Sequence, residues 1–431
     1  MKKMSKILIK NANLISMDEK KEKILYGIDI LIENNIIRKI QMNIQESADK
    51  VINATGKVVM PGLVNTHAHV PMSIFRETVD GYKTQEWLEE KIWPMEEKLT
   101  EEDVYYSSLL TFIEMIYSGN TTINDMYYLE DAIVKAALKA KVRIQLTRTL
   151  MDSDGNGERR YAELKRLIKN VYNKYENISL NVGMSGFYIC SEKCIKIGAE
   201  IAKDKDLPIH IHFCENSKEV EEIKEKYNVS DVISPIKKYL KDYHLVLAHS
   251  VKLTDDEIKE LSKYNVYIAH CPISNLKLGC GIAPIYKMFK NQIIISLGTD
   301  GQGSGCNLDM FETMRFTALL QKGILENPKV FPAYEILKMA TINGAKALKL
   351  DEKIGTIEEG KNADLIIINL DTANTNPIND VFSQIVYNAN GTNVETTIVN
   401  GKILMENRKL KIDVDEKEII KKCEEIINRI K

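Results

Sequence analysis

The feature that most constrains the fold is an alternation of short apolar segments with amphipathic segments between about residues 61 and 350. Parallel strands that alternate with helices form either a closed barrel or an open doubly wound sheet. The chain has no Gly-x-Gly-x-x-Gly after the first strand and no Walker A loop, so eight such units predict a (β/α)8 TIM-type barrel. The first predicted strand ends near His67 and His69, and the others span 121–125, 143–147, 180–184, 208–213, 245–249, 266–270 and 293–298.

The two ends of the chain have a different sequence pattern from this middle region. Residues 6–60 contain short strands separated by polar turns, and the apolar stretches 363–369 and 394–404 repeat that pattern near the other end. We therefore expect residues 1–60 and 351–431 to build one small antiparallel β-sandwich domain beside the barrel of residues 61–350. A charged amphipathic helix is predicted from 413 to 431.

The composition of the chain limits the kinds of molecule that we expect it to bind. The 431 residues include 44% apolar residues and carry a formal charge of -2, so no basic surface for a nucleic acid polymer is expected. No apolar run approaches the ~20 residues of a membrane span, and the first residues lack the apolar core of a signal peptide. The seven cysteines are scattered without a Cys-x-x-Cys pair. These features predict a cytoplasmic protein with reduced thiols and no membrane partner.

His67 and His69 are the first candidates for chemistry. Residues i and i+2 of a strand face the same way, so the two imidazoles can bind one ion. Taken alone, the pair fits two chance histidines in a surface turn equally well. Further histidines and one aspartate also fall at the ends of predicted strands, which meet at one rim of a barrel. They are His212, His249, His270 and Asp300.

Several stretches resemble the amidohydrolase superfamily, and most closely its deaminases of 5'-methylthioadenosine, S-adenosylhomocysteine and 5'-deoxyadenosine. The resemblance covers essentially the whole chain. It rests on Pro61-Gly62-Leu63-Val64-Asn65-Thr66-His67-Ala68-His69, Ile211-His212-Phe213-Cys214-Glu215, His270-Cys271-Pro272-Ile273-Ser274-Asn275-Leu276-Lys277-Leu278, Gly298-Thr299-Asp300-Gly301 and the stretch from Gly355 to Leu365.

The resemblance implies that His67, His69, His212 and Asp300 bind one divalent ion. Three imidazoles and a carboxylate suit Zn2+, and Fe2+ or Mn2+ is compatible with the same donors. His210 is the alternative ligand on the same strand face. The His-x-x-Glu spacing to Glu215 favours His212, which leaves His210 a supporting or packing residue.

The same resemblance implies roles for the groups that move protons. Asp300 would take a proton from a water whose pKa the ion lowers towards ~7, and His249 would orient that water. A protonated Glu215 would face N1 of an adenine, while His270 would support the site from behind. The alternatives are a helix-start carboxylate for Glu215 and a histidine satisfied by backbone for His249.

Substrate binding is predicted for Glu96, Arg148 and Arg160, in addition to Glu215 and Asp300. Glu96 resembles a carboxylate that accepts hydrogen bonds from ribose hydroxyls, with a solvated helical charge run as the alternative. Arg148 and Arg160 resemble arginines that face the 5' substituent, where a guanidinium can pair with an amino-acid carboxylate. Arg159 is an equally plausible surface charge beside Arg160.

One stretch departs from the family pattern. After Gly183 the family usually has an Ala-Pro-His-(Ser/Ala)-Pro-Tyr type of segment, whose histidine contacts substrate. Residues 184–191 are shorter and contain no histidine, and we expect Phe187 to offer an apolar surface instead.

Three functions are therefore considered. The first is a metal-dependent deaminase that converts the adenine ring of 5'-modified adenosines to the inosine analogue and ammonia, and that is homo-oligomeric by analogy with the family. The second is an aminohydrolase or chlorohydrolase of another heteroaromatic ring such as guanine, a pterin or a triazine. The third is a metal-free scaffold, which the presence of all four ligand positions disfavours.

Overall fold

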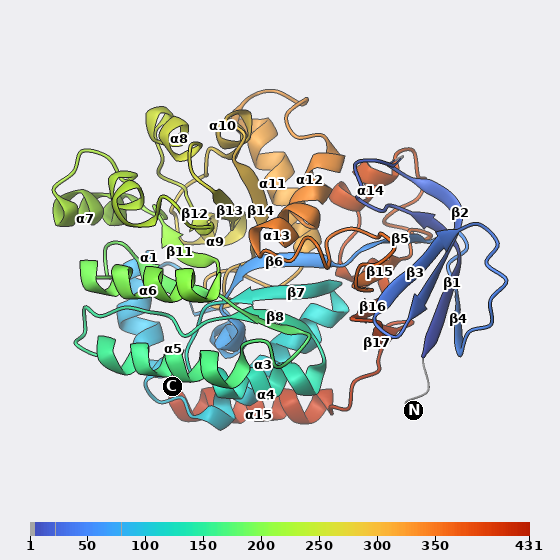
Figure 1. The fold of residues 1–431 in the computed structure, drawn as a ribbon, viewed down its shortest axis with the longest axis horizontal. Coiled ribbons are helices and arrows are strands. Elements are labelled where there is room, and N and C mark those ends of the chain that lie inside the picture. The colour runs from blue at the N-terminus through green and yellow to red at the C-terminus, as the bar shows by residue number, and fades with distance from the viewer. Residues whose placement is uncertain (1–4, 22, 79) are drawn as a thin grey trace.

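A barrel of parallel strands forms the centre of the computed structural model, which describes residues 5–21, 23–78 and 80–431 (Figure 1). One sheet has the order β6-β7-β8-β9 and the other β10-β11-β12-β13-β14. β9 and β10 are halves of one strand interrupted at Asn181. The strands are β6 (Leu63–Ala68), β7 (Asn120–Asp125), β8 (Arg143–Leu146), β9 (Ile178–Leu180), β10 (Val182–Gly186), β11 (Ile209–Phe213), β12 (Leu245–His249), β13 (Val266–His270) and β14 (Ile294–Leu297).

Two hydrogen bonds join the last strand of the barrel to the first. The backbone N–H of Asp300, just beyond β14, donates to the carbonyl of His67 in β6 over 3.0 Å. The Thr66 hydroxyl donates to the carbonyl of Leu297 over 2.8 Å. The carboxyl ends of all these strands therefore lie at one rim, and the predicted (β/α)8 fold is confirmed.

Helices cover the outside of the barrel (Figure 1). Short polar residues start several of them: Thr100 forms a capping box with Asp103, Thr254 forms one with Glu257, and Ser191 caps the helix that follows it. The main helices are α3 (Glu101–Tyr117), α4 (Glu130–Ala140), α5 (Gly157–Val171), α6 (Glu192–Lys205), α7 (Ser217–Tyr227), α8 (Asp255–Leu261), α10 (Ile285–Lys290), α11 (Met310–Ile324), α12 (Ala333–Met339) and α13 (Ile342–Ala347).

An irregular helical segment follows β6 and covers part of the rim. It begins with the 3-10 helix η1 (Val70–Phe75) and continues through α1 (Thr84–Trp87), η2 (Leu88–Ile92) and α2 (Trp93–Glu96). Pro94 lies at the start of α2, where its missing N–H costs no helical hydrogen bond.

Strands from both chain ends form one further sheet. β15 pairs with β5, so the C-terminal strands extend the N-terminal ones. The expectation of a purely antiparallel sheet was wrong, because β1 pairs in parallel with both β4 and β5. β1 bends between these two partners at Asn11, whose φ is +59°. The strands are β1 (Lys6–Leu14), β2 (Leu25–Glu33), β3 (Ile36–Gln41), β4 (Lys50–Asn53), β5 (Val58–Pro61), β15 (Leu365–Ile368), β16 (Val394–Val399), β17 (Lys402–Glu406) and β18 (Lys409–Leu410).

The C-terminal helix α15 (Glu416–Ile430) packs against α3, with Ile419, Cys423, Ile426 and Ile430 buried. No helix in the described ranges has the length and apolarity needed to cross a membrane. The division at residues 60 and 350 stays a prediction.

A buried ion pair joins the barrel to the sheet. The Arg143 guanidinium in β8 donates to both carboxylate oxygens of Asp364, over 2.7 and 2.9 Å. Asp364 also accepts from the backbone N–H of Asn400 over 2.8 Å. Both charged side chains are at most 3% exposed, so each depends on the other for compensation.

Replacing Asp364 with alanine should lower the free energy of unfolding by about 3–5 kcal/mol, because the buried Arg143 then loses its partner. Lys135→Ala is the control, since the Lys135–Glu101 pair is exposed and should contribute less than about 1 kcal/mol. Urea denaturation of both variants measures the difference. Equal losses would contradict the role given to the buried pair.

Candidate active site

Four predicted ligands converge at the rim. Nε2 of His69 lies 3.2 Å from Oδ1 of Asp300 and 3.4 Å from Nε2 of His212. Nε2 of His67 lies 3.5 Å from the same Asp300 oxygen. Ligand atoms of His67, His69 and His212 lie within 4.8 Å of one another, as do those of His67, His249 and Asp300. One ion could therefore contact donors from β6, β11 and the end of β14.

Hydrogen bonds behind the rings orient two of the imidazoles. Nδ1 of His69 lies 2.6 Å from the carbonyl of Met126, and Nδ1 of His212 lies 2.7 Å from the carbonyl of Ser185. A carbonyl only accepts, so each Nδ1 carries the hydrogen. In the neutral form of each ring, the lone pair of Nε2 is then directed at the centre of the cluster, as a metal ligand requires.

The third imidazole has a buried nitrogen without a partner. Burial lowers the pKa of His67 to about 4, which favours the neutral ring. Its Nε2 has no hydrogen-bond partner among the described residues. Its Nδ1 lies 2.9 Å from Nε2 of His210, whose other nitrogen lies 3.2 Å from the Asn124 amide. His210 therefore stands behind His67, and the orphaned Nε2 fits a position for an ion.

The charges of the rim residues also fit a cation bound between them. Burial opposes ionisation of Asp300, but the neighbouring rings of His67 and His69 hold its pKa well below the usual range. Burial likewise lowers the pKa of His69, but Asp300 outweighs it and raises that pKa to about 9. The buried carboxylate thus requires positive charge beside it, which a divalent ion would supply. Three imidazoles and one carboxylate are suitable donors for such an ion.

Two rim residues adopt left-handed backbone conformations. His249 has φ +72° and Asp300 has φ +63°, an arrangement that L-residues adopt at a cost and that gathers at functional sites. Nδ1 of His249 lies 2.9 Å from Oδ1 of Asn275. The Ser274 hydroxyl donates to Oδ2 of Asp300 over 2.6 Å. His249 therefore bonds a side chain, in contrast to the alternative in which backbone satisfied it.

Glu215 occupies a buried position beside this cluster. Its backbone N–H and that of Cys214 donate to the two carboxylate oxygens of Glu219, over 2.7 and 2.8 Å. Asn216, not Glu215, caps helix α7. Burial raises the pKa of Glu215, which favours the protonated form that a general acid needs.

Glu96 faces the site from α2. The Tyr127 hydroxyl donates to its carboxylate over 2.6 Å, and the Tyr128 hydroxyl donates to its backbone carbonyl over 3.1 Å. Burial raises the pKa of Glu96 to about 7, although the Tyr127 bond and the charge of His69 lower it. This environment differs from the solvated charge run that was the alternative.

Comparisons with known proteins agree with this geometry. The amidohydrolase family profile matches residues 58–404. A 5-methylthioadenosine/S-adenosylhomocysteine deaminase of Caldanaerobacter subterraneus subsp. tengcongensis is 41% identical, and the alignment covers 95% of both chains. A 5'-deoxyadenosine deaminase of Methanosarcina mazei is 40% identical over 99% of this chain and 100% of that one.

This chain belongs to the amidohydrolase family. Its fold also matches the crystal structure of an adenosine deaminase from Xanthomonas campestris with bound zinc, at a TM-score of 0.93 and 27% identity. That match covers 99% of this chain and 98% of the other.

Both predicted arginines of this amidohydrolase are already paired with carboxylates. Nε of Arg148 lies 2.6 Å from Glu163 and 3.4 Å from Glu130. The Arg160 guanidinium binds both oxygens of Asp154, over 2.5 and 2.6 Å. A carboxylate on a substrate would therefore compete with these internal partners.

The expectation for Phe187 was wrong. Its ring is fully buried and packs edge-on against Phe213 and Tyr227, so it contributes to the core and not to a pocket surface. The ammonium of Lys226 holds the backbone around Phe187 in place, because it donates to the carbonyls of residues 187, 188 and 190. The neighbouring Tyr188 instead packs over Gly186.

His270 keeps its ring inside the barrel. The residue is 1% exposed, and neither ring nitrogen has a hydrogen-bond partner among the described residues. Its predicted supporting role stays a prediction.

The sequence did not reveal the roles of Ser274 and Asn275. The stretch that contains them carried the family resemblance, but a serine and an asparagine in a predicted loop give no signal of which side chains they contact. Gly298 is a second such position, because a Cβ there would lie 2.9 Å from Cβ of His67. Glycine is thus required where β14 passes the first ligand.

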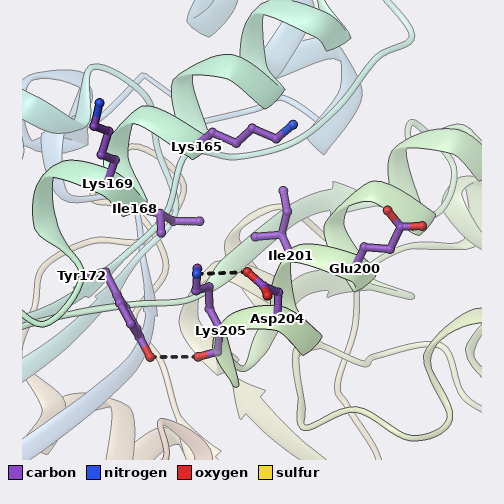
Figure 2. Close-up of a pocket in the computed structure, with 8 residues that line it drawn as sticks. All are labelled: Lys165, Ile168, Lys169, Tyr172, Glu200, Ile201, Asp204 and Lys205. Carbon is purple, nitrogen blue, oxygen red and sulfur yellow. Dashed lines mark hydrogen bonds and ion pairs between the residues drawn. The ribbon is translucent and has the colours of Figure 1, made fainter.

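A separate groove of about 630 Å³ lies on the outside of the barrel between α5 and α6 (Figure 2). Lys205 pairs there with Asp204 over 3.0 Å, and Tyr172 donates to the carbonyl of Lys205 over 3.0 Å. None of the predicted site residues lines this groove, so the rim is the better candidate for chemistry.

Proposed function

We propose that this amidohydrolase converts 5'-modified adenosines to the corresponding inosine analogues and ammonia. The substrate class comprises 5'-methylthioadenosine, S-adenosylhomocysteine, 5'-deoxyadenosine and adenosine. The observation that carries the proposal is the convergence of three Nε2 atoms and Asp300 beside a buried Glu215 whose raised pKa favours the acid. The names of the two relatives above support the choice of an adenosine ring.

His67, His69, His212 and Asp300 would hold one divalent ion, with zinc proposed as the metal. Such an ion supplies Lewis acidity that makes a water molecule acidic near neutral pH. Asp300 accepts the proton of the attacking water, and His249 orients that water through its other ring nitrogen, Nε2. Asn275 fixes this orientation of the ring.

Glu215 completes the proton transfers of the proposed reaction. Attack of the water oxygen at C6 places negative charge on N1, and the protonated carboxyl of Glu215 donates a proton there. The C6–N bond then breaks as the departing amine takes the proton held by Asp300 and leaves as ammonia, and the C6 hydroxyl returns its proton to Glu215 as the carbonyl forms. The products are the C6 carbonyl compound and ammonia, so one water is consumed for each amine released.

A second candidate is hydrolysis of another heteroaromatic amine or halide, such as guanine, a pterin or a triazine. The absence of a histidine from residues 184–191 favours it, because one expected polar contact to a nucleoside is missing. A homo-oligomeric state and a cytoplasmic location stay predictions.

Steady-state assays distinguish the two candidates. The zinc-loaded enzyme should remove the adenine absorbance of at least one of the four nucleosides and release one ammonia for each. Because both predicted arginines are paired internally, 5'-methylthioadenosine and 5'-deoxyadenosine should have higher kcat/KM than S-adenosylhomocysteine. Turnover of only guanine, a pterin or a triazine would establish the second candidate.

Glu96 provides a test of ribose binding. Glu96→Gln should raise KM for 5'-deoxyadenosine roughly 10- to 100-fold, because hydrogen bonds to a charged group contribute ~1.5–3 kcal/mol. Since the pKa of Glu96 is about 7, the wild-type KM should fall as pH rises through that value and the carboxylate ionises. The variant should lack this dependence.

2′,3′-Dideoxyadenosine is the matched control substrate, since it lacks both ribose hydroxyls. Its KM should be nearly the same for wild type and Glu96→Gln. An equal rise in KM for both substrates would contradict the proposal that Glu96 binds the ribose hydroxyls.

A further inference from the structure

One connection touches all three groups that the proposed reaction uses to move protons. This connection lies between β13 and β14 and contains α9 (Pro272–Lys277). Ser274 donates to Asp300 and Asn275 bonds His249, as described above. The chain then turns back at Gly279, with φ +68°, and the N–H of Cys280 donates to the carbonyl of Asn275 over 2.8 Å. The turn brings Cys280 to Glu215.

Cys280 contacts the carboxyl group of Glu215 directly. Its Sγ lies 3.6 Å from Oε1 of Glu215 and 3.4 Å from Oγ1 of Thr84. The residue is only 3% exposed. In the described part of the chain, no other side chain forms a hydrogen bond to this carboxyl group. The Glu219 carboxylate fixes the backbone N–H of Glu215, whereas Cys280 hydrogen-bonds its carboxyl group.

We propose that Cys280 is the positioning residue for the acid Glu215, an inference that rests on the proposed function. The thiol donates to Oε1, so the proton of the neutral carboxyl group stays on Oε2, which remains free to face the substrate. The Thr84 hydroxyl in turn donates to Sγ and fixes the direction of the thiol. A thiol is a weak donor, so Cys280 orients the acid without itself transferring a proton.

This chain of bonds also connects two parts of the site. Thr84 begins α1, and the helical segment that it starts leads through η2 to Glu96 on α2. The residue proposed to bind ribose and the residue proposed to protonate the base are thus joined through Thr84 and Cys280. Movement of this segment would alter the orientation of the acid.

Kinetics of Cys280 variants test the proposal. Cys280→Ala should lower kcat for 5'-deoxyadenosine roughly 2- to 10-fold, with KM and metal content unchanged, because one weak hydrogen bond to the acid is lost. Cys280→Ser should restore most of kcat, since its hydroxyl can donate to the same oxygen. Cys423→Ala is the matched control, because it removes a buried thiol from α15 and should not alter kcat.

Thr84→Val tests the same chain without altering the thiol. It should lower kcat about twofold in the wild type and have no effect in Cys280→Ala, as expected for residues that act in series. If Cys280→Ala folds poorly, the effect of Thr84→Val on kcat can instead be compared in the wild type and in Cys280→Ser.

The outcomes separate the two proposals. An active wild type whose Cys280→Ala variant keeps kcat, or whose Cys280→Ser variant is no better than alanine, would overturn the positioning role alone. A rise in KM without a fall in kcat would do the same. A wild type inactive on all four adenosines would overturn the proposed function, and this inference with it.

Discussion

The rim depends on the need of a buried carboxylate for positive charge. Asp300 is 5% exposed, and the rings of His67 and His69 lie 3.5 and 3.2 Å from its Oδ1. Without a cation this arrangement retains a proton on His69, whose pKa is raised to about 9. A divalent ion can replace that proton and use the lone pairs that backbone carbonyls have directed inward. Backbone carbonyls thus orient two of the surrounding rings, and the charge of one aspartate accounts for the need of a cation between them.

The groups that hydrogen-bond the rim residues lie at strand ends and in the loops that follow them. Met126 and Ser185 lie beyond β7 and within β10, and their carbonyls fix two rings. Ser274 and Asn275 come from a single connection and fix two more groups. Because these groups hold the side chains by hydrogen bonds before any substrate binds, the site is largely preorganised. The strained backbone at His249 and Asp300 is a further cost that this framework sustains.

The alternation of strands and helices predicted the barrel because several strands, such as β12 and β14, are largely buried and mostly apolar on both faces, which leaves a strong pattern. The positions of His67, His69, His212 and Asp300 followed from the rule that strand ends meet at one rim. The parallel pairing of β1 with β4 and β5 was not predictable, because register depends on a bend at Asn11 that has no apolar signal. Phe187 was misassigned because its burial depends on Phe213 and Tyr227, which are distant in sequence. The pairing of Arg148 with Glu130 and Glu163 was not predicted for the same reason, because these partners are also distant in sequence.

The proposed reaction assigns metal binding and acid catalysis to different carboxylates. Metal content and turnover of Glu215→Gln and Asp300→Asn test it most directly. Glu215→Gln should bind about one equivalent of zinc, as the wild type does, and lose most of its turnover. Asp300→Asn should lose both zinc and turnover, because it removes the ligand and the base together. Full activity in either variant, or loss of zinc from Glu215→Gln alone, would contradict the account.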